Sequence, residues 1–300
     1  AADDKSYPSI YCGSKKQLTT AIRAPLIQPR VPDCFNEAII SVPNHLTFRT
    51  DSGDQAYGIY YRPKNNQLNL SPNILPPLII NVHGGPTGTA QSALNPMHQF
   101  WTSRGVAVFD LNHRGSTGYG KTFRKKLYGQ WGIADVRDTI NAVKHLVKQG
   151  LANAGQIAIR GGSAGGYLVL ACLADSDLFS AGVSYYGIAD LELLTKDTHK
   201  FESRYLERLI GPYPEKIELY KNRSPISKLQ NIDAPVFILQ GKLDKIVPPN
   251  QADLLYAELV EKNPETQILC FEDEGHGFRK PSNQIKALDR ELAFYQKNLF

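Results

Sequence analysis

The stretch that most constrains how this chain can fold runs from residue 156 to 174 and reads as a strand, a tight turn and a helix. Ile157 and Ile159 alternate as in a strand, and a proline-free apolar run follows the turn. Ser163 lies at the corner, inside the pattern Gly161-x-Ser163-x-Gly165. Glycine-sized neighbours let two segments pack closely around a strained serine, as in a nucleophile elbow. The pattern therefore predicts an exposed, nucleophilic Ser163.

The rest of the chain alternates strand and helix patterns. An antiparallel hairpin is expected from residues 46–50 and 56–61, which a turn-forming segment joins. Further strands are expected at 78–82, 106–109, 181–186, 236–240 and 267–271, and helical segments at 134–148, 190–210, 251–261 and 283–298. Repeated βα units predict an α/β protein with a doubly wound, mostly parallel sheet and antiparallel N-terminal strands. Reactive side chains are then expected at the carboxyl ends of the strands.

Residues 1–40 differ from the remainder, with four prolines and no sustained periodicity. We predict an N-terminal arm or connector there and a catalytic domain over 41–300. The composition, 42% hydrophobic and 21% charged, is that of a globular protein.

Charge and hydropathy argue against nucleic acid and membrane as partners of this chain. The net charge of +5 comes from scattered Lys and Arg, which favours a solvated basic surface over nucleic-acid binding. No apolar run reaches the roughly 20 residues that span a bilayer, and the first residues lack a signal-peptide pattern. The four cysteines have no metal-ligand spacing. We therefore expect no membrane partner and a cytoplasmic location.

A serine hydroxyl needs a base to become a good nucleophile. Of the seven histidines, His276 has the best setting, in a glycine-rich loop between a predicted strand and the last helix. His83 also ends a strand, but it precedes Ser163, whereas the hydrolase order places the base last.

The base in turn needs a carboxylate that fixes its tautomer. Asp244 follows the strand at 236–240 and falls between Ser163 and His276, which gives the order Ser, Asp, His. Asp273 and Glu274 are rivals beside His276, but residues so close in sequence rarely reach the far imidazole nitrogen. We expect them to be solvated turn carboxylates.

Acyl transfer also needs N–H donors for the oxyanion. We assign the first donor to the backbone of Ala164, at the start of the helix, and the second to Gly85, in the loop after the 78–82 strand. No cofactor is expected, because the glycines around Ser163 match neither a P-loop nor the G-x-G-x-x-G fingerprint.

Several motifs occur together in this sequence: His83-Gly84-Gly85-Pro86, Asn112 to Gly120, Gly129-Gln130-Trp131-Gly132, Gly161 to Gly166, and Glu274-Gly275-His276-Gly277-Phe278. With them the chain resembles the prolyl oligopeptidase family, and within it the acylaminoacyl-peptidase and dipeptidyl-peptidase branch, from about Pro43 onward. The resemblance implies an α/β-hydrolase domain with a Ser163, Asp244, His276 triad, no metal, and short peptide substrates. It also implies that Ile188, Leu191 and Leu194 line the pocket for the residue before the scissile bond, where apolar side chains favour an apolar residue.

The sequence departs from the family pattern at three places. The chain has Ala164 where several members have tyrosine after the nucleophile, and His113 where tyrosine is common before Arg-Gly. Members usually carry a β-propeller before the hydrolase domain, and residues 1–40 resemble its last strand and connector. The sequence leaves open whether a propeller belongs to the full-length protein and whether chains form a homo-oligomer.

Three functions remain in view. The first is a serine peptidase of aminoacyl- or acylaminoacyl-peptidase type that works through an acyl-enzyme. The second is a carboxylesterase that uses the same triad on small esters. The third, a non-catalytic binding module on a hydrolase fold, would be expected to have a damaged triad, whereas all three residues are present.

Overall fold

A mixed β-sheet carries the architecture of the protein. The structure, a computed structural model, describes residues 4–5, 10–11, 25–27, 39–51, 53–65, 74–197 and 205–300. The large sheet comprises β3 (Pro43–Arg49), β4 (Gln55–Tyr61), β5 (Leu78–Val82), β6 (Ala107–Asn112), β7 (Ile157–Gly162), β8 (Ala181–Tyr185), β9 (Val236–Gly241) and β10 (Gln267–Phe271). Their order is β10-β9-β8-β7-β5-β6-β4-β3, parallel from β10 to β6 and antiparallel at β4 and β3.

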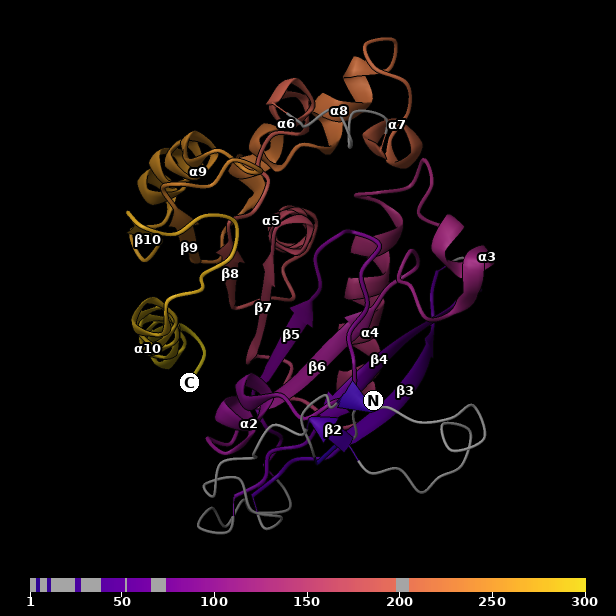
Figure 1. Cartoon of the computed structure of the whole chain (residues 1–300), viewed down its shortest axis with the longest axis vertical. Coiled ribbons are helices and arrows are strands. Elements are labelled where there is room, and N and C mark those ends of the chain that lie inside the picture. The colour runs from indigo at the N-terminus through magenta and orange to yellow at the C-terminus, as the bar shows by residue number, and fades with distance from the viewer. Residues whose placement is uncertain are drawn as a thin grey trace.

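Helices cover both faces of this sheet (Figure 1). The longer ones are α4 (Ala134–Lys148), α5 (Ala164–Asp175), α9 (Pro249–Lys262) and α10 (Pro281–Asn298), and the shorter ones are α2 (Pro96–Thr102) and α3 (Gly120–Lys125). Helices α4, α5 and α9 contribute to the larger apolar core, whereas α2 and α10 close the smaller core on the opposite face. The sheet is therefore sandwiched between two helical layers.

Strand β5 illustrates how the sequence builds these two cores. Leu78 and Ile80 pack into the larger core and Ile79 into the smaller one, because successive side chains of a strand point to opposite faces. A strand buried on both faces reads as a mostly apolar run, and residues 78–82 are apolar except for Asn81.

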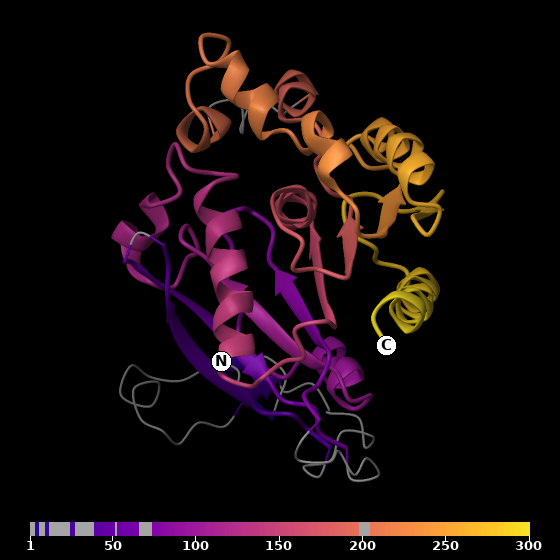
Figure 2. The same ribbon diagram turned by 180° about the vertical axis from the view of Figure 1, so that it is seen from behind.

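A cap of short helices lies beyond the carboxyl end of the parallel strands, away from β3 and β4 (Figures 1 and 2). It consists of α6 (Leu191–Asp197), α7 (Tyr205–Leu209), α8 (Ile217–Arg223) and the 3-10 helix η1 (Pro225–Asn231). The cap contributes apolar side chains to the larger core, among them Leu206 and Tyr220. Its position at this edge places it over the region where reactive side chains are expected.

The predicted α/β class and the mostly parallel sheet with antiparallel N-terminal strands are confirmed. The hairpin is β3 paired with β4, and the expected helix at 134–148 coincides with α4. Sequence reasoning missed α2, α3 and α8, which are short and carry no repeated apolar stripe.

The division into an arm over 1–40 and a domain over 41–300 stays a prediction, since most of the arm lies outside the described residues. Within it, β1 (Ile10–Tyr11) and β2 (Pro25–Ile27) form a separate antiparallel pair. No helix in the described part of the chain combines the length and apolar character needed to cross a bilayer.

Candidate active site

Ser163 occupies the sharp turn between β7 and α5. Its backbone has φ 59° and ψ −122°, a conformation that non-glycine residues rarely adopt and that is typical of strained functional positions. The flanking positions have no space for a side chain. A Cβ on Gly161 would lie 2.6 Å from Cγ2 of Val82, and one on Gly165 would lie 2.4 Å from the Val82 carbonyl oxygen. The serine therefore stands at the carboxyl edge of the sheet, on a turn that only these small neighbours allow.

His276 lies in the loop after β10 and faces the serine. Its Nε2 is 2.9 Å from the Ser163 Oγ, within hydrogen-bond distance. The loop approaches β9 closely, because a Cβ on Gly241 would lie 2.5 Å from the carbonyl oxygens of Glu274 and Gly275. The His276 side chain keeps 19% of its surface exposed, so a reacting group can reach it.

Asp244 completes the relay from the loop after β9. Its Oδ2 is 2.8 Å from His276 Nδ1, and its Oδ1 accepts the backbone N–H groups of Ile246 and Val247 at 2.8 and 2.9 Å. The side chain is fully buried. A carboxylate fixed in this way accepts a hydrogen bond from the Nδ1–H group, which keeps the proton on Nδ1 and leaves Nε2 of His276 free to accept the proton of Ser163.

The two rival carboxylates point elsewhere. Asp273 is 51% exposed and accepts hydrogen bonds from the side chains of Lys280 and Asn283, in agreement with the expected turn role. The same expectation is wrong for Glu274, which is buried and accepts the backbone N–H groups of Arg279 and Lys280 at 2.9 Å. Glu274 thus anchors the segment that joins the His276 loop to α10.

Gly85 and Ala164, the predicted oxyanion donors, line the same cavity as Ser163 and His276. Ala164 opens α5, where N–H groups lack an intrahelical acceptor. The loop after β5 lies against the elbow, since a Cβ on Gly84 would be 3.0 Å from the carbonyl oxygen of Gly162. Backbone from both segments therefore borders the space beside the serine hydroxyl.

A pair of stacked histidines supports the Gly84-Gly85 loop from behind. The rings of His83 and His113 have centroids 4.7 Å apart, and His83 Nε2 lies 2.7 Å from the Ser116 Oγ. Burial lowers the pKa of His83, and burial together with the neighbouring His83 lowers the pKa of His113 to about 3. Both rings are therefore neutral near neutral pH and serve packing.

We expect this pair to make the fold acid-sensitive. In the unfolded chain His113 is protonated below its ordinary pKa of 6.5, whereas in the folded chain it stays neutral down to about pH 3. Between these values the unfolded chain binds more protons, so the free energy of unfolding decreases as the pH is lowered. His113 alone should lower the free energy of unfolding by about 2 kcal/mol at pH 5 relative to pH 7.5, and His83 should lower it further. Urea unfolding of wild type and His113→Gln at both pH values measures the difference. The same substitution at the exposed His45 is the control, and an equal pH effect in all three proteins would contradict the assignment.

The cavity beside the triad has a volume of about 240 Å³ and apolar walls. Of the three predicted pocket residues, the structure places Ile188 and Leu194 in its lining. The predicted position of Leu191 in the pocket is wrong: Leu191 is fully buried in the core, and its backbone N–H donates to the Ser224 Oγ. Sequence reasoning did not assign the following lining residues to the pocket: Pro86, Trp131, Tyr205, Leu206, Ile246 and Val247. They come from four separate segments, and only Pro86 and Trp131 belong to motifs that the sequence pattern singled out.

A larger hollow of about 430 Å³ lies behind Tyr186 and Phe278, between α2 and α10. Its lining includes neither Ser163 nor His276, so the smaller cavity is the one that faces the reactive groups. Within the described residues, no cluster of His, Cys, Asp and Glu side chains is arranged to hold a metal ion.

Comparison with known families matches residues 93–300 to the prolyl oligopeptidase family of peptidases. Dipeptidyl peptidase family member 6 of Caenorhabditis elegans is 32% identical over 245 residues, which cover 79% of this chain and 33% of the relative. The chain spans about a third of the length of the curated relatives that it matches.

Solved structures of similar proteins agree with this match. A puromycin-hydrolyzing peptidase of Mycobacterium tuberculosis superposes with a TM-score of 0.89 at 40% identity, covering 94% of this chain and 43% of that one. An acylaminoacyl peptidase in complex with Z-Gly-Gly-Phe-chloromethyl ketone gives a TM-score of 0.78 at 27% identity, covering 86% of this chain and 41% of that one.

Proposed function

Because the chain belongs to the prolyl oligopeptidase family, we propose that it is the catalytic part of a serine peptidase that cleaves short peptides and aminoacyl amides after a large apolar residue. The observation that carries this proposal is the relay from Ser163 Oγ through His276 to Asp244, with two hydrogen-bond distances of 2.9 and 2.8 Å. It stands at the mouth of an apolar cavity of a size suited to one side chain.

The chemistry follows from these positions. His276 Nε2 takes the proton of Ser163 as Oγ attacks the scissile carbonyl carbon, and the N–H groups of Gly85 and Ala164 stabilise the oxyanion. The imidazolium, stabilised by Asp244, then gives its proton to the leaving amine nitrogen, which departs and leaves an acyl ester on Ser163. Water attacks this ester with His276 again as base, which releases the acid and restores the serine.

The walls of the cavity support an apolar preference at the residue before the scissile bond. Trp131 and Tyr205 contribute aromatic faces, and Leu194, Leu206 and Val247 contribute aliphatic ones. Among the described residues that line the cavity there is no Asp, Glu, Lys or Arg. Burying an unpaired substrate charge there would be costly. The acylaminoacyl peptidase in complex with Z-Gly-Gly-Phe-chloromethyl ketone, a compound that ends in a phenylalanine side chain, is in keeping with this preference.

A panel of p-nitroanilides tests this proposal. We expect phenylalanine and leucine anilides to be cleaved with kcat/KM at least about 100-fold above aspartate and lysine anilides, because the charged side chains lose hydration without a partner. N-acetylated and free versions of each compound report which amino terminus is accepted. Matched p-nitrophenyl esters complete the panel, and turnover of esters without measurable amide cleavage would favour a carboxylesterase and contradict the proposal.

We also propose that a further domain covers the catalytic face in the full-length protein, as the family resemblance implies for a β-propeller. The curated relatives are about three times as long as the matched region. Leu243 and Ile246, beside the triad, are 61% and 44% exposed, so this face offers two large apolar side chains for such a domain to cover.

A further inference from the structure

The wall of the catalytic cavity that carries Trp131 is a short loop, residues 129–132, held at several points. The N–H groups of Gly129 and Trp131 donate to the carbonyl oxygens of Arg208 and Leu209 at 2.9 and 3.2 Å. These bonds connect the loop to α7, which supplies Tyr205 and Leu206 to the same cavity. The 129–132 loop and α7 are therefore one hydrogen-bonded unit in the wall of the cavity.

Arg223 secures the loop from a second side. Its guanidinium donates to the carbonyl oxygens of Trp131 and Gly129, both at 3.1 Å. Tyr167 packs beneath, with its ring centroid 4.7 Å from that of Trp131, and its hydroxyl donates to the Arg223 carbonyl oxygen. A Cβ on Gly132 would lie only 2.1 Å from this hydroxyl, so the loop has no room to shift toward α5.

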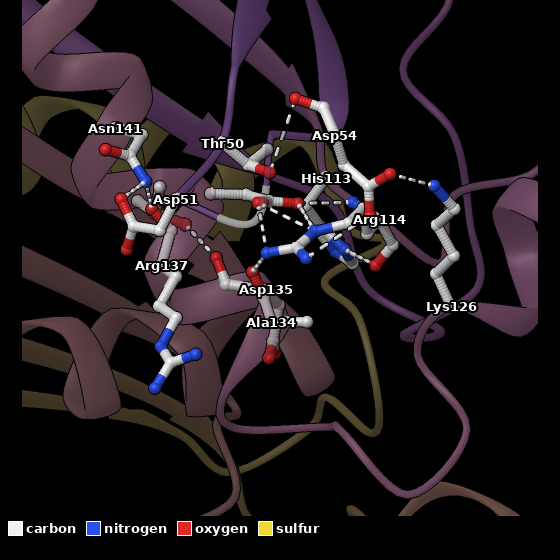
Figure 3. Close-up of polar contacts among 12 residues, drawn as sticks. Thr50, Asp51, Asp54, His113, Arg114, Lys126, Ala134, Asp135, Arg137 and Asn141 are labelled. Atoms are coloured by element: carbon white, nitrogen blue, oxygen red, sulfur yellow. Dashed lines mark hydrogen bonds and ion pairs between the residues drawn. The ribbon is translucent and has the colours of Figure 1, made fainter.

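Asp135 provides the remaining anchor. It lies in the first turn of α4, is fully buried, and accepts the Gly132 N–H through Oδ1 at 2.7 Å. Its Oδ2 is buried without a hydrogen-bond partner among the described residues. Figure 3 places Asp135 next to the polar contacts of Arg114, yet the guanidinium pairs with Asp138 and not with Asp135. A buried carboxylate with one unsatisfied oxygen is costly for stability, and such groups call for a functional explanation.

We propose that Asp135 is a positioning residue for substrate recognition, whose carboxylate holds Gly132 and thereby keeps Trp131 in the wall of the catalytic cavity. The inference rests on the proposed function for the identity of the cavity as the substrate site. It predicts that Asp135 acts on the binding of large apolar side chains and leaves the chemistry at Ser163 to the triad.

The surroundings of Asp135 add a dependence on pH. Asp138, paired with Arg114, lies on the same helix; Tyr167 and Cys172 face it from α5, and Arg223 from α8. Burial raises the pKa of Asp135 to about 7, opposed by backbone N–H groups and reinforced by Asp138, whereas burial keeps Tyr167 and Cys172 neutral by raising their pKa values. The ionised form, present above this pKa, is the stronger acceptor for Gly132. The anchor therefore weakens as pH falls through neutrality.

Kinetics of Asp135→Ala and Asp135→Asn test the role. For a phenylalanine anilide at pH 8, we expect Asp135→Ala to raise KM about tenfold with kcat changed less than threefold, the pattern of lost uniform binding. An alanine anilide, too small to reach Trp131, should be affected less than twofold. In Asp135→Asn the amide oxygen still accepts the Gly132 N–H but carries no charge, so KM should equal that of wild type with Asp135 protonated and should not change with pH through neutrality. An equal loss for both substrates, or an unchanged KM for phenylalanine in Asp135→Ala, would overturn the proposal.

Tryptophan fluorescence gives a readout that needs no activity. The chain has two tryptophans, so Trp101→Phe leaves Trp131 as the only tryptophan, which is excited selectively over the tyrosines at long wavelength. We expect its emission to titrate with a midpoint near pH 7, to persist when His276 is replaced by Ala, and to become independent of pH in Asp135→Asn. Asp138→Asn, the same change one turn along α4, is the matched control and should keep the transition, with its midpoint moved to lower pH because the Asp138 charge no longer raises the pKa of Asp135. Emission that titrates equally with Asn at position 135 would refute the role of Asp135 even if the peptidase assignment holds, and an inactive enzyme with the expected titration would refute only the latter.

Discussion

Replacing Ser163 by Ala is expected to lower kcat for a phenylalanine anilide by about 10⁵- to 10⁶-fold, because the acyl-enzyme can no longer form. The remaining rate should reflect the oxyanion donors and substrate binding alone. KM should change little, because the serine side chain is small and the cavity walls stay in place. Single-turnover and steady-state kinetics measure the effect.

A matched substitution shows whether the loss is specific. Ser180 precedes β8, and its hydroxyl donates to the Gly155 carbonyl oxygen, at the opposite edge of the sheet from Ser163. Ser180→Ala should retain wild-type kcat, and circular dichroism should find both variants folded. If Ser163→Ala kept more than about 1% of the activity, the nucleophile would have to be another residue.

Asp244→Asn is expected to lower kcat by about 10⁴-fold. The amide can still accept the N–H groups of Ile246 and Val247, so the loop should keep its place. The amide group can also donate to His276 Nδ1, which would leave the proton on Nε2 and prevent that nitrogen from accepting the proton of Ser163. Measured kcat at pH 8, with KM as the check on binding, tests this tautomer effect.

Asp273→Asn is the control for Asp244→Asn, since it removes a carboxylate from the same region of sequence as His276. Asp273 contacts Lys280 and Asn283, so we expect less than a twofold change in kcat. Comparable losses in the two variants would indicate a general electrostatic effect and contradict the assigned relay.

The sheet and the order of the chemical groups could be predicted because both depend on local patterns. Residues 78–82 and 157–159 are apolar except for Asn81, and Ser163, Asp244 and His276 each follow a predicted strand. Parallel strands bring their carboxyl ends to one edge, so strand-following residues come together without knowledge of any side-chain contact. In a chain of repeated βα units, the residues that follow the strands can therefore be predicted from the sequence to lie close together.

The walls of the cavity could not be predicted in the same way. Trp131 and Tyr205 come from segments that are 74 positions apart, and hydrogen bonds between the 129–132 loop and α7 join these segments in the folded chain. Leu191 and Leu194 look equivalent in sequence, yet only Leu194 reaches the cavity. Which apolar residue faces a cavity depends on how the cap packs, and no local pattern records this.

The burial of two carboxylates also could not be predicted from the sequence. Asp135 and Asp138 appear as the polar face of α4 in the sequence, but both are fully buried, one against the Gly132 N–H and the other against Arg114. Hydrophobic periodicity treats every carboxylate as solvated, so a carboxylate kept inside by specific partners escapes it. The cytoplasmic location and the arm over residues 1–40 stay predictions.

The central claim is that Ser163 is the nucleophile activated by His276. Labelling with a fluorophosphonate, followed by peptide mass spectrometry, tests it most directly, because the reagent bonds to an activated serine without requiring the natural substrate. We predict one modification per chain, on the peptide that carries Ser163, with labelling abolished in Ser163→Ala and strongly slowed in His276→Ala. Stoichiometric modification of any other residue, or undiminished labelling of Ser163→Ala, would contradict the account.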